Sequence, residues 1–352
     1  YSILEDRQGD LWFGSTQGLA RFDGQTFQSF VYEDGFDPGH GPQRRLMEDA
    51  DGGVWYGASR FDGKRFTTMT QADGLVRGVE HLIQDRNGTI WASLWAYSLA
   101  RLVDGHFVGF TGIEGLQQQW ARSLLEDRHG TLWIGTWHGG VVRWDGRQAT
   151  SLTEADGLGD DGVFSLFEDR DGHVWLGTWT GGVSRWDGRE LRTWTMAEGL
   201  AGNWVTTIAQ DRDGNMLFGT LGGGVSLFDG LVMQTLSTLD GLAHDVVWDL
   251  HQDRRGDIWI ATEGGLTRYR PLRTPPPIEL GRGLGAPAPG HVDAVTSDDV
   301  LVFEFHGRSF KSRPGQLAYL YRLVGLDDRW RPTREERVEL PVPGRGDYVF
   351  EV

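Results

Sequence analysis

The sequence predicts an all-β fold, a seven-bladed β-propeller followed by an immunoglobulin-like β-sandwich that is incomplete at its C-terminus. Three observations predict this fold: one sequence motif recurs along the chain, short runs of alternating polarity are bounded by Gly and Asp, and helical periodicity is absent. The motif consists of Glu or Gln, then Asp, a polar pair, Gly, two further residues and usually Trp. Its Asp recurs at spacings of 43, 36, 42, 42, 42 and 42 residues, at Asp6, Asp49, Asp85, Asp127, Asp169, Asp211 and Asp253. That period is the length of one propeller blade.

Each repeat unit predicts four strands with apolar residues at fixed places. Asp-Gly between the third and fourth strands, as at Asp187-Gly188, is a strong hairpin signal. Six residues after the repeated Asp the sequence places Trp12, Trp55, Trp91, Trp133, Trp175, Leu217 and Trp259. Three residues before it stand Ile3, Leu46, Leu82, Leu124, Leu166, Ile208 and Leu250. We expect both sets to form the core between blades, where each burial contributes roughly 1.5–3 kcal/mol.

The repeat stops after Arg270, and a different pattern follows. Pro271 to Pro277 contains four prolines and predicts a stiff, extended linker. Alternating polarity returns at 299–305, 317–323 and 346–352, which is typical of a small β-sandwich. We therefore expect a propeller over 1–270, a Pro-rich linker over 271–280 and a sandwich over 281–352. The last segment is shorter than the roughly 100 residues of an immunoglobulin-like domain, so we expect at least one strand of the sandwich to be missing from it.

Composition and charge exclude several classes of protein. The 352 residues include 52 Gly and no Cys, so disulfide frameworks, Cys-ligated zinc and thiol nucleophiles are excluded. With 34 basic and 50 acidic side chains the net charge is −16, and no basic stripe offsets it, so we expect no nucleic-acid partner. No apolar run approaches the 18 or more residues of a membrane helix.

The seven units resemble the two-component regulator propeller repeat. The tail resembles the three-Y domain that follows such repeats, on the segments 319–330, with Tyr319 and Tyr321, and 343–350, with Tyr348. Together the two resemblances cover nearly the whole chain. They imply the extracytoplasmic sensor region of a bacterial two-component regulator, often a hybrid histidine kinase.

This resemblance also implies a location, partners and an activity. The chain is expected on the periplasmic or extracytoplasmic side of a bacterial inner membrane, with no enzymatic activity and no cofactor of its own. A small molecule or oligosaccharide would be its ligand, and a membrane-anchored output domain in the same full-length protein would receive the signal. Histidine kinase activity would then belong to a part of the full-length protein outside this chain. The resemblance also implies that the protein can form a homodimer.

One face of the propeller varies between blades and gathers aromatic residues. The loops between the second and third strands are longer in four adjacent blades, and the loops leading into the innermost strands lie on the same face. Together they supply Trp95, Tyr97, Trp120, Trp137, His138, Trp179 and Trp204. Flat aromatic rings in a wet groove bind sugar rings, and Trp or Tyr also anchors protein partners. The alternative is that these rings only fill gaps between blades.

A second set of candidates lies five residues before the repeated Asp, near the upper end of the innermost strands. This position varies while its neighbours repeat, and it includes Arg44, Glu80, Arg122 and Trp248. Adjacent Arg45, His81 and Asp249 replace the Ser or Thr of other blades. Such groups beside the central channel either orient a polar ligand or form structural ion pairs.

The acidic residues and histidines raise two other possibilities, a metal site and a catalytic site. Asp49, Asp169 and Asp211 open segments that resemble the start of a calcium loop, but other copies break the pattern, so no metal site is predicted. An alternative function is a propeller lyase or glycosidase with Glu80, His81 and Asp249 as acid and base. A protein-interaction scaffold is the third possibility.

Overall fold

A computed structural model gives the arrangement of the chain. It describes residues 2–31, 34, 36, 45–75, 78–94, 98–116, 119–271, 278–280, 300–307, 317–341 and 348–352. The chain divides into two compact units, Tyr1–Leu227 with Thr235–Pro271, and Phe228–Gln234 with Leu272–Val352. The described residues are almost entirely strands and turns, with four short 3-10 helices. None of those helices has the length and apolarity needed to span a bilayer.

The first 271 residues form successive antiparallel sheets, as the repeat predicts. The first three sheets, in strand order, are β1 (Ser2–Glu5), β2 (Leu11–Gly14), β3 (Leu19–Phe22), β4 (Phe27–Phe30); β5 (Leu46–Glu48), β6 (Val54–Tyr56), β7 (Ser59–Phe61), β8 (Phe66–Thr68); and β9 (Val79–Gln84), β10 (Ile90–Leu94), β11 (Ser98–Val103), β12 (His106–Gly109). The next two are β13 (Ala121–Glu126), β14 (Leu132–Thr136), β15 (Val141–Trp144), β16 (Ala149–Leu152); and β17 (Val163–Glu168), β18 (Val174–Thr178), β19 (Val183–Trp186), β20 (Leu191–Trp194).

The last two sheets of this series differ in strand number. They are β21 (Val205–Gln210), β22 (Met216–Thr220), β23 (Val225–Phe228), β24 (Met233–Leu236), and then β25 (Val247–Gln252), β26 (Ile258–Thr262), β27 (Gly265–Tyr269). Single 3-10 turns follow four of the outer strands: η2 (Gln71–Asp73), η4 (Glu154–Asp156), η5 (Met196–Glu198) and η6 (Thr238–Asp240). Among the described residues the final sheet therefore has three strands where each of the others has four.

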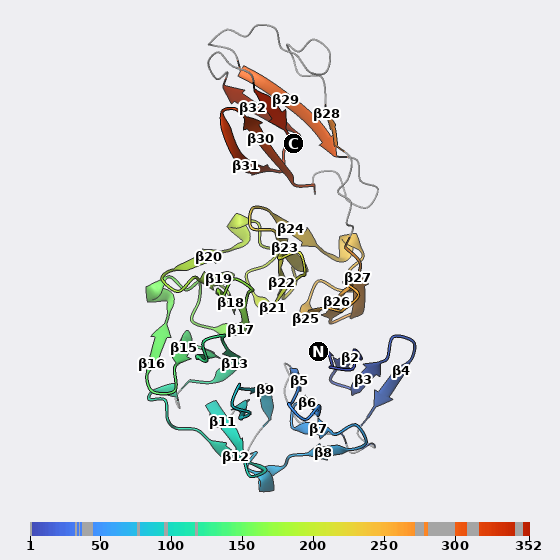
Figure 1. The fold of residues 1–352 in the computed structure, drawn as a ribbon, viewed down its shortest axis with the longest axis vertical. Helices are drawn as coiled ribbons and strands as arrows, with labels where there is room; N and C mark the ends of the chain where they lie inside the picture. The colour runs from blue at the N-terminus through green and yellow to red at the C-terminus, as the bar shows by residue number, and fades with distance from the viewer. Residues whose placement is uncertain are drawn as a thin grey trace. The chain divides into compact units, whose positions relative to one another are not determined.

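The sheets are arranged in a closed ring (Figure 1). Each innermost strand contacts the innermost strand of the next sheet, and β25 contacts β1, which closes the circle. The expected core residues lie between the sheets: Trp12, Trp55, Trp91, Trp133, Trp175, Leu217 and Trp259 are all buried. Radial four-stranded sheets with buried aromatic residues between them define a β-propeller.

The repeated Asp organises the turn between the first and second strands of each sheet. In the fourth sheet, Oδ1 of Asp127 accepts the backbone N–H groups of His129 and Thr131, both at 2.9 Å. Its Oδ2 accepts the indole N–H of Trp133 at 2.8 Å. The sixth sheet has Leu217 in place of Trp, and there the amide of Asn215 donates to Asp211 Oδ2 at 2.8 Å. The carboxylate thus fixes both a tight turn and a core side chain.

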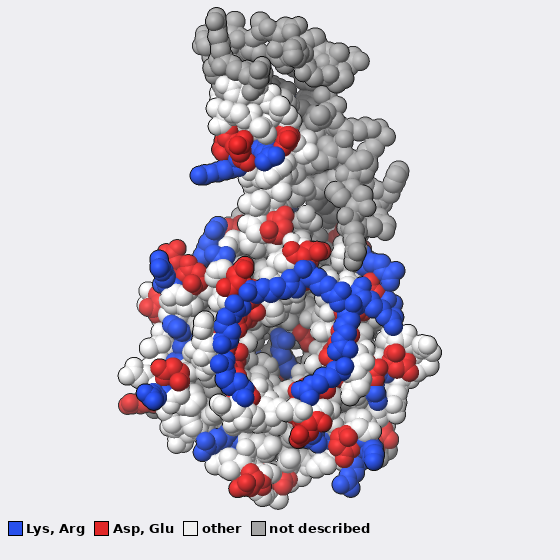
Figure 2. Space-filling model, viewed as in Figure 1, with Lys and Arg blue, Asp and Glu red and all other residues white. Residues whose placement is uncertain are grey.

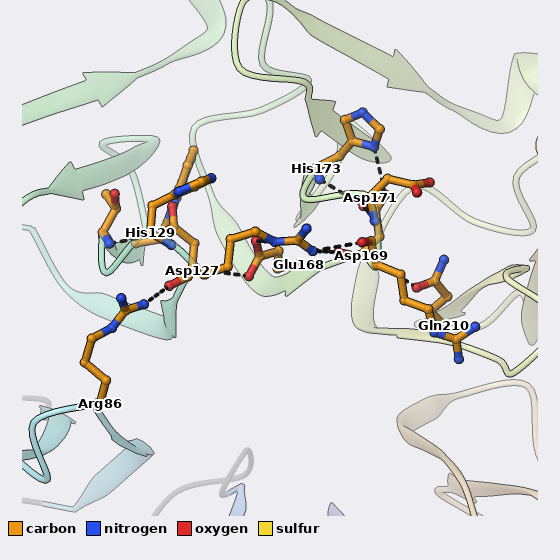
Figure 3. Close-up of polar contacts among 12 residues, drawn as sticks. Arg86, Asp127, His129, Glu168, Asp169, Asp171, His173 and Gln210 are labelled. Carbon is orange, nitrogen blue, oxygen red and sulfur yellow. Dashed lines mark hydrogen bonds and ion pairs between the residues drawn. The ribbon is translucent and has the colours of Figure 1, made fainter.

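Arginines on the same turns tie neighbouring sheets together. The Arg86 guanidinium donates to Glu126 Oε1 at 2.8 Å and to the backbone carbonyl of Asp127 at 2.6 Å. Arg128 makes the same contacts to Glu168 and to the carbonyl of Asp169 (Figure 3). Arg254 donates to the carbonyl of Asp6 at 3.0 Å and so joins the last sheet to the first. Figure 2 shows the resulting ring of basic side chains around the central opening.

Among its described residues, the C-terminal unit has two three-stranded sheets. Their strands are β28 (Ile278–Leu280), β29 (Val300–Gly307) and β32 (Arg337–Pro341) in one, and β31 (Asp327–Thr333), β30 (Tyr319–Val324) and β33 (Val349–Glu351) in the other. Phe303 and Phe350 stack across the sheets with ring centroids 3.9 Å apart, and Phe305 and Tyr319 are buried beside them. Residues 278–280, expected in the linker, pair with β29 because their apolar residues alternate. The remaining linker residues lie outside the described ranges.

We expect the substitution Asp127→Ala to destabilise the propeller by about 2–4 kcal/mol, because it leaves the buried Trp133 indole N–H and two turn N–H groups without their acceptor. The measurement is urea unfolding followed by Trp fluorescence. Asp145→Ala is the control, since Asp145 also accepts two backbone N–H groups but lies in an exposed turn. Equal losses for the two variants would contradict the role given to the repeated Asp.

Stability should fall at acid pH partly through Asp257. Hydrogen bonds from Arg270 and Arg268 lower the pKa of Asp257 from 3.8 to about 2. Because the folded pKa is depressed, this contribution is present above pH 4 and disappears as the pH falls from about 4 to about 2. Between about pH 4 and about pH 2, the free energy of unfolding of Asp257→Asn should therefore decrease less than that of the parent protein. An unchanged pH profile would contradict this assignment.

Candidate functional site

The loops that the sequence assigned to one face are joined there by backbone hydrogen bonds. The N–H of Trp137, between β14 and β15, donates to the carbonyl of Trp120, just before β13, at 2.9 Å. The N–H of Leu221 donates in the same way to the carbonyl of Trp204 at 2.9 Å. Each such loop therefore rests on the segment that leads into the innermost strand of its own sheet. We call this side of the propeller the loop face.

A β-bulge recurs in five of the innermost strands, β9, β13, β17, β21 and β25, at the end next to the loop face. In β13, Ala121 pairs with Thr136 and Ser123 pairs with Gly135, so Arg122 is an extra, unpaired residue. The same shift isolates one residue in each of four other strands: Glu80, Phe164, Thr206 and Trp248. A bulge turns a side chain away from its regular direction. These five are the residues at the variable sequence position five before the repeated Asp.

Aromatic rings from three successive sheets form one continuous cluster on the loop face. Trp137 lies at the centre, with ring centroids 5.2 Å from Trp179, 5.1 Å from Phe164 and 6.4 Å from Trp120. Trp204 continues it, 5.4 Å from Trp179 and 5.7 Å from Phe164. His138 is exposed at its edge, 5.9 Å from Trp137. We call Trp120, Trp137, His138, Phe164, Trp179 and Trp204 the aromatic cluster.

The Arg122 side chain lies within this cluster and carries a buried charge. Its guanidinium carbon is 4.9 Å from the Trp137 ring centroid and 4.8 Å from that of Phe164. It also donates to Glu80 Oε2 at 2.5 Å, and both side chains are buried. Burial lowers the pKa of Arg122, and the Glu80 carboxylate opposes that shift. Arg122 and Glu80 therefore form an ion pair next to the aromatic cluster, and the cation–π contacts of Arg122 add to the stability of this ion pair.

A second polar group connects strands on the other side of the ring. Asp249 Oδ2 accepts from Ser2 Oγ and the Ile3 N–H, at 3.1 and 2.8 Å. Its Oδ1 accepts from the Arg45 guanidinium at 3.2 Å, the Thr207 hydroxyl at 3.0 Å and the Leu250 N–H at 3.0 Å. Arg45 reaches on to the carbonyl of Thr206 at 3.4 Å. This is the structural ion pair that the sequence left open as one interpretation.

His81 is held in its neutral form in the channel wall. Its Nδ1 accepts the Leu124 N–H at 2.8 Å, a bond that protonation of Nδ1 would break. Desolvation, with the Arg45 charge as a smaller cause, lowers the pKa of His81 to about 3. At neutral pH it therefore contributes a neutral ring to the wall.

The structure brings together most, but not all, of the residues predicted from sequence. Arg122 contacts the aromatic cluster and Glu80 pairs with Arg122, while Arg45 lies just before β5 and Trp248 lies in β25. The indole N–H of Trp248 is buried and has no acceptor among the described residues. Trp95, Tyr97 and Arg44 lie outside the described residues. Phe164 was not among the predicted site residues. The sequence feature that could have identified Phe164 is its variable position, five residues before the repeated Asp. An apolar residue on an innermost strand is, however, typical of the core.

Asp169, Asp171 and His173 also come together, in the turn between β17 and β18 (Figure 3). Their potential ligand atoms all lie within 4.8 Å of one another. The Asp169 carboxylate, however, already accepts the Trp175 indole N–H at 2.8 Å and two backbone N–H groups of its turn. The cluster is accounted for by the same turn that every sheet carries.

Comparison with known families and structures agrees with the fold. The family model "two component regulator propeller" matches residues 1–17, 115–138, 157–180, 199–222 and 241–264. No curated protein matches the chain in a sequence comparison.

Solved structures share the fold at low sequence identity. The extracellular domain of a proposed hybrid two-component system from B. thetaiotaomicron is 16% identical, with a TM-score of 0.53 over 99% of this chain and 64% of its own length. Streptogramin B lyase is 16% identical, with a TM-score of 0.59 over 76% of this chain and 91% of its own. PorZ, a surface component of the type-IX secretion system of Porphyromonas gingivalis, is 13% identical, with a TM-score of 0.55 over 94% of this chain and 53% of its own. This chain thus spans under two thirds of the first of these domains.

The substitution Glu80→Gln should destabilise the protein by about 3 kcal/mol, because it removes the carboxylate that pairs with the buried Arg122 charge. Glu126→Gln is the matched control, since Glu126 pairs with the half-exposed Arg86 and should cost under about 1 kcal/mol. Urea unfolding measures both. A loss for Glu80→Gln no larger than for Glu126→Gln would show that the Arg122 pair is not effectively buried.

Proposed function

We propose that this chain is the ligand-sensing region of a bacterial two-component regulator, with a seven-bladed propeller and an immunoglobulin-like C-terminal sandwich of the three-Y type. The proposal includes an extracytoplasmic location and a membrane-anchored output domain in the same polypeptide. The family match and the resemblance to an extracellular two-component domain support the sensor role. The predicted domains are the propeller over 1–270 and the sandwich over 281–352, joined by the linker.

The aromatic cluster is the observation that carries the proposal of a ligand site. Trp137, Trp179 and Trp204 are only partly buried, although they lie in contact with one another. A protein that needed these rings only as filling would bury them as it buries Trp133 and Trp175. Partly exposed indole faces beside a fixed Arg122–Glu80 pair suit a ligand with flat apolar faces and polar edges. An oligosaccharide has that character.

An enzymatic function has less support from the same geometry. The three residues considered as acid or base are engaged: Glu80 by Arg122, Asp249 by five donors, and His81 Nδ1 by the Leu124 N–H. General acid–base groups must be free to exchange a proton with the substrate. The likeness to lyases is a likeness of fold at 16% identity, and it transfers no chemistry to this chain.

Ligand binding is tested by a thermal-shift screen of neutral and acidic oligosaccharides. A ligand at 100 times its Kd should stabilise the protein by about 2.7 kcal/mol. For a ligand so identified, Trp137→Ala and Trp179→Ala should weaken binding at least about tenfold. Phe27→Ala, which truncates an exposed ring on β4, is the matched control and should leave affinity unchanged.

Three outcomes would count against parts of this proposal. If no oligosaccharide stabilises the protein, the oligosaccharide form is wrong. If a ligand binds equally to the parent and both Trp variants, the site lies elsewhere. If a bound oligosaccharide is released as shorter products, the chain is an enzyme.

A further inference from the structure

Arginine follows the repeated Asp in six of the seven sheets and contributes to the ring of basic side chains around the central opening (Figure 2). These residues, all exposed, are Arg7, Arg86, Arg128, Arg170, Arg212 and Arg254. The second sheet has Ala50 at this place, which interrupts the series. Each guanidinium donates to a backbone carbonyl in the turn of the next sheet, as Arg170 does to Arg212 at 2.9 Å. Their positive charges are therefore held in a row from turn to turn.

The residue before the repeated Asp determines whether each arginine is neutralised. In every sheet its side chain accepts the backbone N–H of the residue that follows the repeated Asp in the preceding sheet. Glu168 does so for Arg128 at 2.8 Å, and Gln210 does so for Arg170 at 3.0 Å. Glu168 also pairs with the Arg128 guanidinium at 2.6 Å, whereas the Gln210 amide donates to the carbonyl of Gly214 in its own turn. Glu and Gln therefore serve the turn equally but differ in charge.

Two arginines on neighbouring sheets are left without a carboxylate. The turns of Arg170 and Arg212 adjoin Gln210 and Gln252, and neither arginine forms an ion pair among the described residues. The other four pair with Glu48, Glu126, Glu168 and Glu5. Six guanidinium groups thus face four carboxylates, and two positive charges remain unneutralised in a chain whose net charge is −16.

The acidic residues on the turns of these two arginines do not take the place of the missing carboxylates. Asp169 and Asp211 are buried and accept N–H groups of their own turns. In the part of the chain that the structure describes, Asp171 and Asp213 form no ion pair with either arginine. An exposed, unneutralised guanidinium suits an oxyanion, because its planar set of N–H donors matches the spacing of phosphate oxygens.

We propose that Arg170 and Arg212, with the flanking arginines of the ring, bind a small anion that carries two or more phosphate groups. The Arg170 guanidinium lies against the turn that carries Arg212, so one compact ligand can meet both charges. A second phosphate group gives the second guanidinium its own partner. This inference involves no residue of the aromatic cluster and is independent of the ligand proposed for the loop face.

Isothermal titration calorimetry with pyrophosphate at low ionic strength tests the proposal. Pyrophosphate should bind, and its affinity should fall as salt is added, because exposed charges are screened. The double variant Gln210→Glu, Gln252→Glu supplies the two missing carboxylates and should weaken binding at least about tenfold. Its Tm should not fall, because Glu occupies this place in four other sheets. Arg189→Gln, which removes an exposed charge between β19 and β20, is the control and should leave the affinity unchanged.

A variant that gains affinity separates recognition from any loss of folding. Glu168→Gln keeps an acceptor for the Arg128 N–H but removes the carboxylate from its guanidinium, so pyrophosphate should bind at least about threefold more tightly. The proposal is overturned if pyrophosphate does not bind, if the double Glu variant binds it as tightly as the parent, or if Glu168→Gln does not tighten binding. Equal affinity for citrate, a carboxylate of similar size and charge, would show that the arginines do not select phosphate and would also overturn it.

Discussion

The propeller depends on one carboxylate that is repeated in every sheet. Through Oδ1 it holds the turn between the first two strands, and through Oδ2 it holds the indole N–H of a buried Trp, as Asp169 does for Trp175. The backbone carbonyl of the same Asp169 accepts the guanidinium of Arg128 from the preceding sheet. Turn, core and inter-sheet contact are therefore coupled at a single residue. Repeating this unit closes the ring, because Arg254 makes the same contact with Asp6.

This coupling explains why the two faces of the propeller differ. On the face that carries the turns of the repeated Asp, which we call the turn face, this carboxylate holds each turn of the ring, and Asp169 with Asp171 and His173 belongs to one of these turns. The repeated Asp does not lie on the loop face, so the side chains there vary between sheets. At two of the β-bulges, Arg122 and Phe164 contact Trp137 in the aromatic cluster. The same turn is thus repeated between sheets on one face of the propeller, and the other face carries the aromatic cluster.

The sequence predicted the features that repeat and missed those that depend on three-dimensional closure. The period of the repeat and the buried Trp residues could be predicted from positions such as Asp127 and Trp133. The loop face could be predicted from the loops that differ between repeats. A bulge, however, cannot be recognised from the sequence of one strand, so Phe164 was left out of the candidate site although it stands at the variable position. Pairing of Glu80 with Arg122, and of Arg45 with Asp249, required knowledge of which strands adjoin across the ring.

Local substitutions were also hard to read from sequence. Asn215 replaces the missing Trp as donor to Asp211, a contact that only the turn geometry reveals. In the C-terminal unit, β31 and β32 were not foreseen, because charged residues such as Arg331 and Arg337 obscure their alternation.

The division between a fixed turn face and a ligand-binding loop face is tested most directly by NMR of the Trp indole N–H groups during ligand titration. The account predicts that signals of Trp120, Trp137, Trp179 and Trp204 shift on binding. Signals of Trp12, Trp55, Trp133 and Trp259, whose indoles donate to the repeated Asp, should stay in place. Shifts confined to the second group, with the first unchanged, would contradict it.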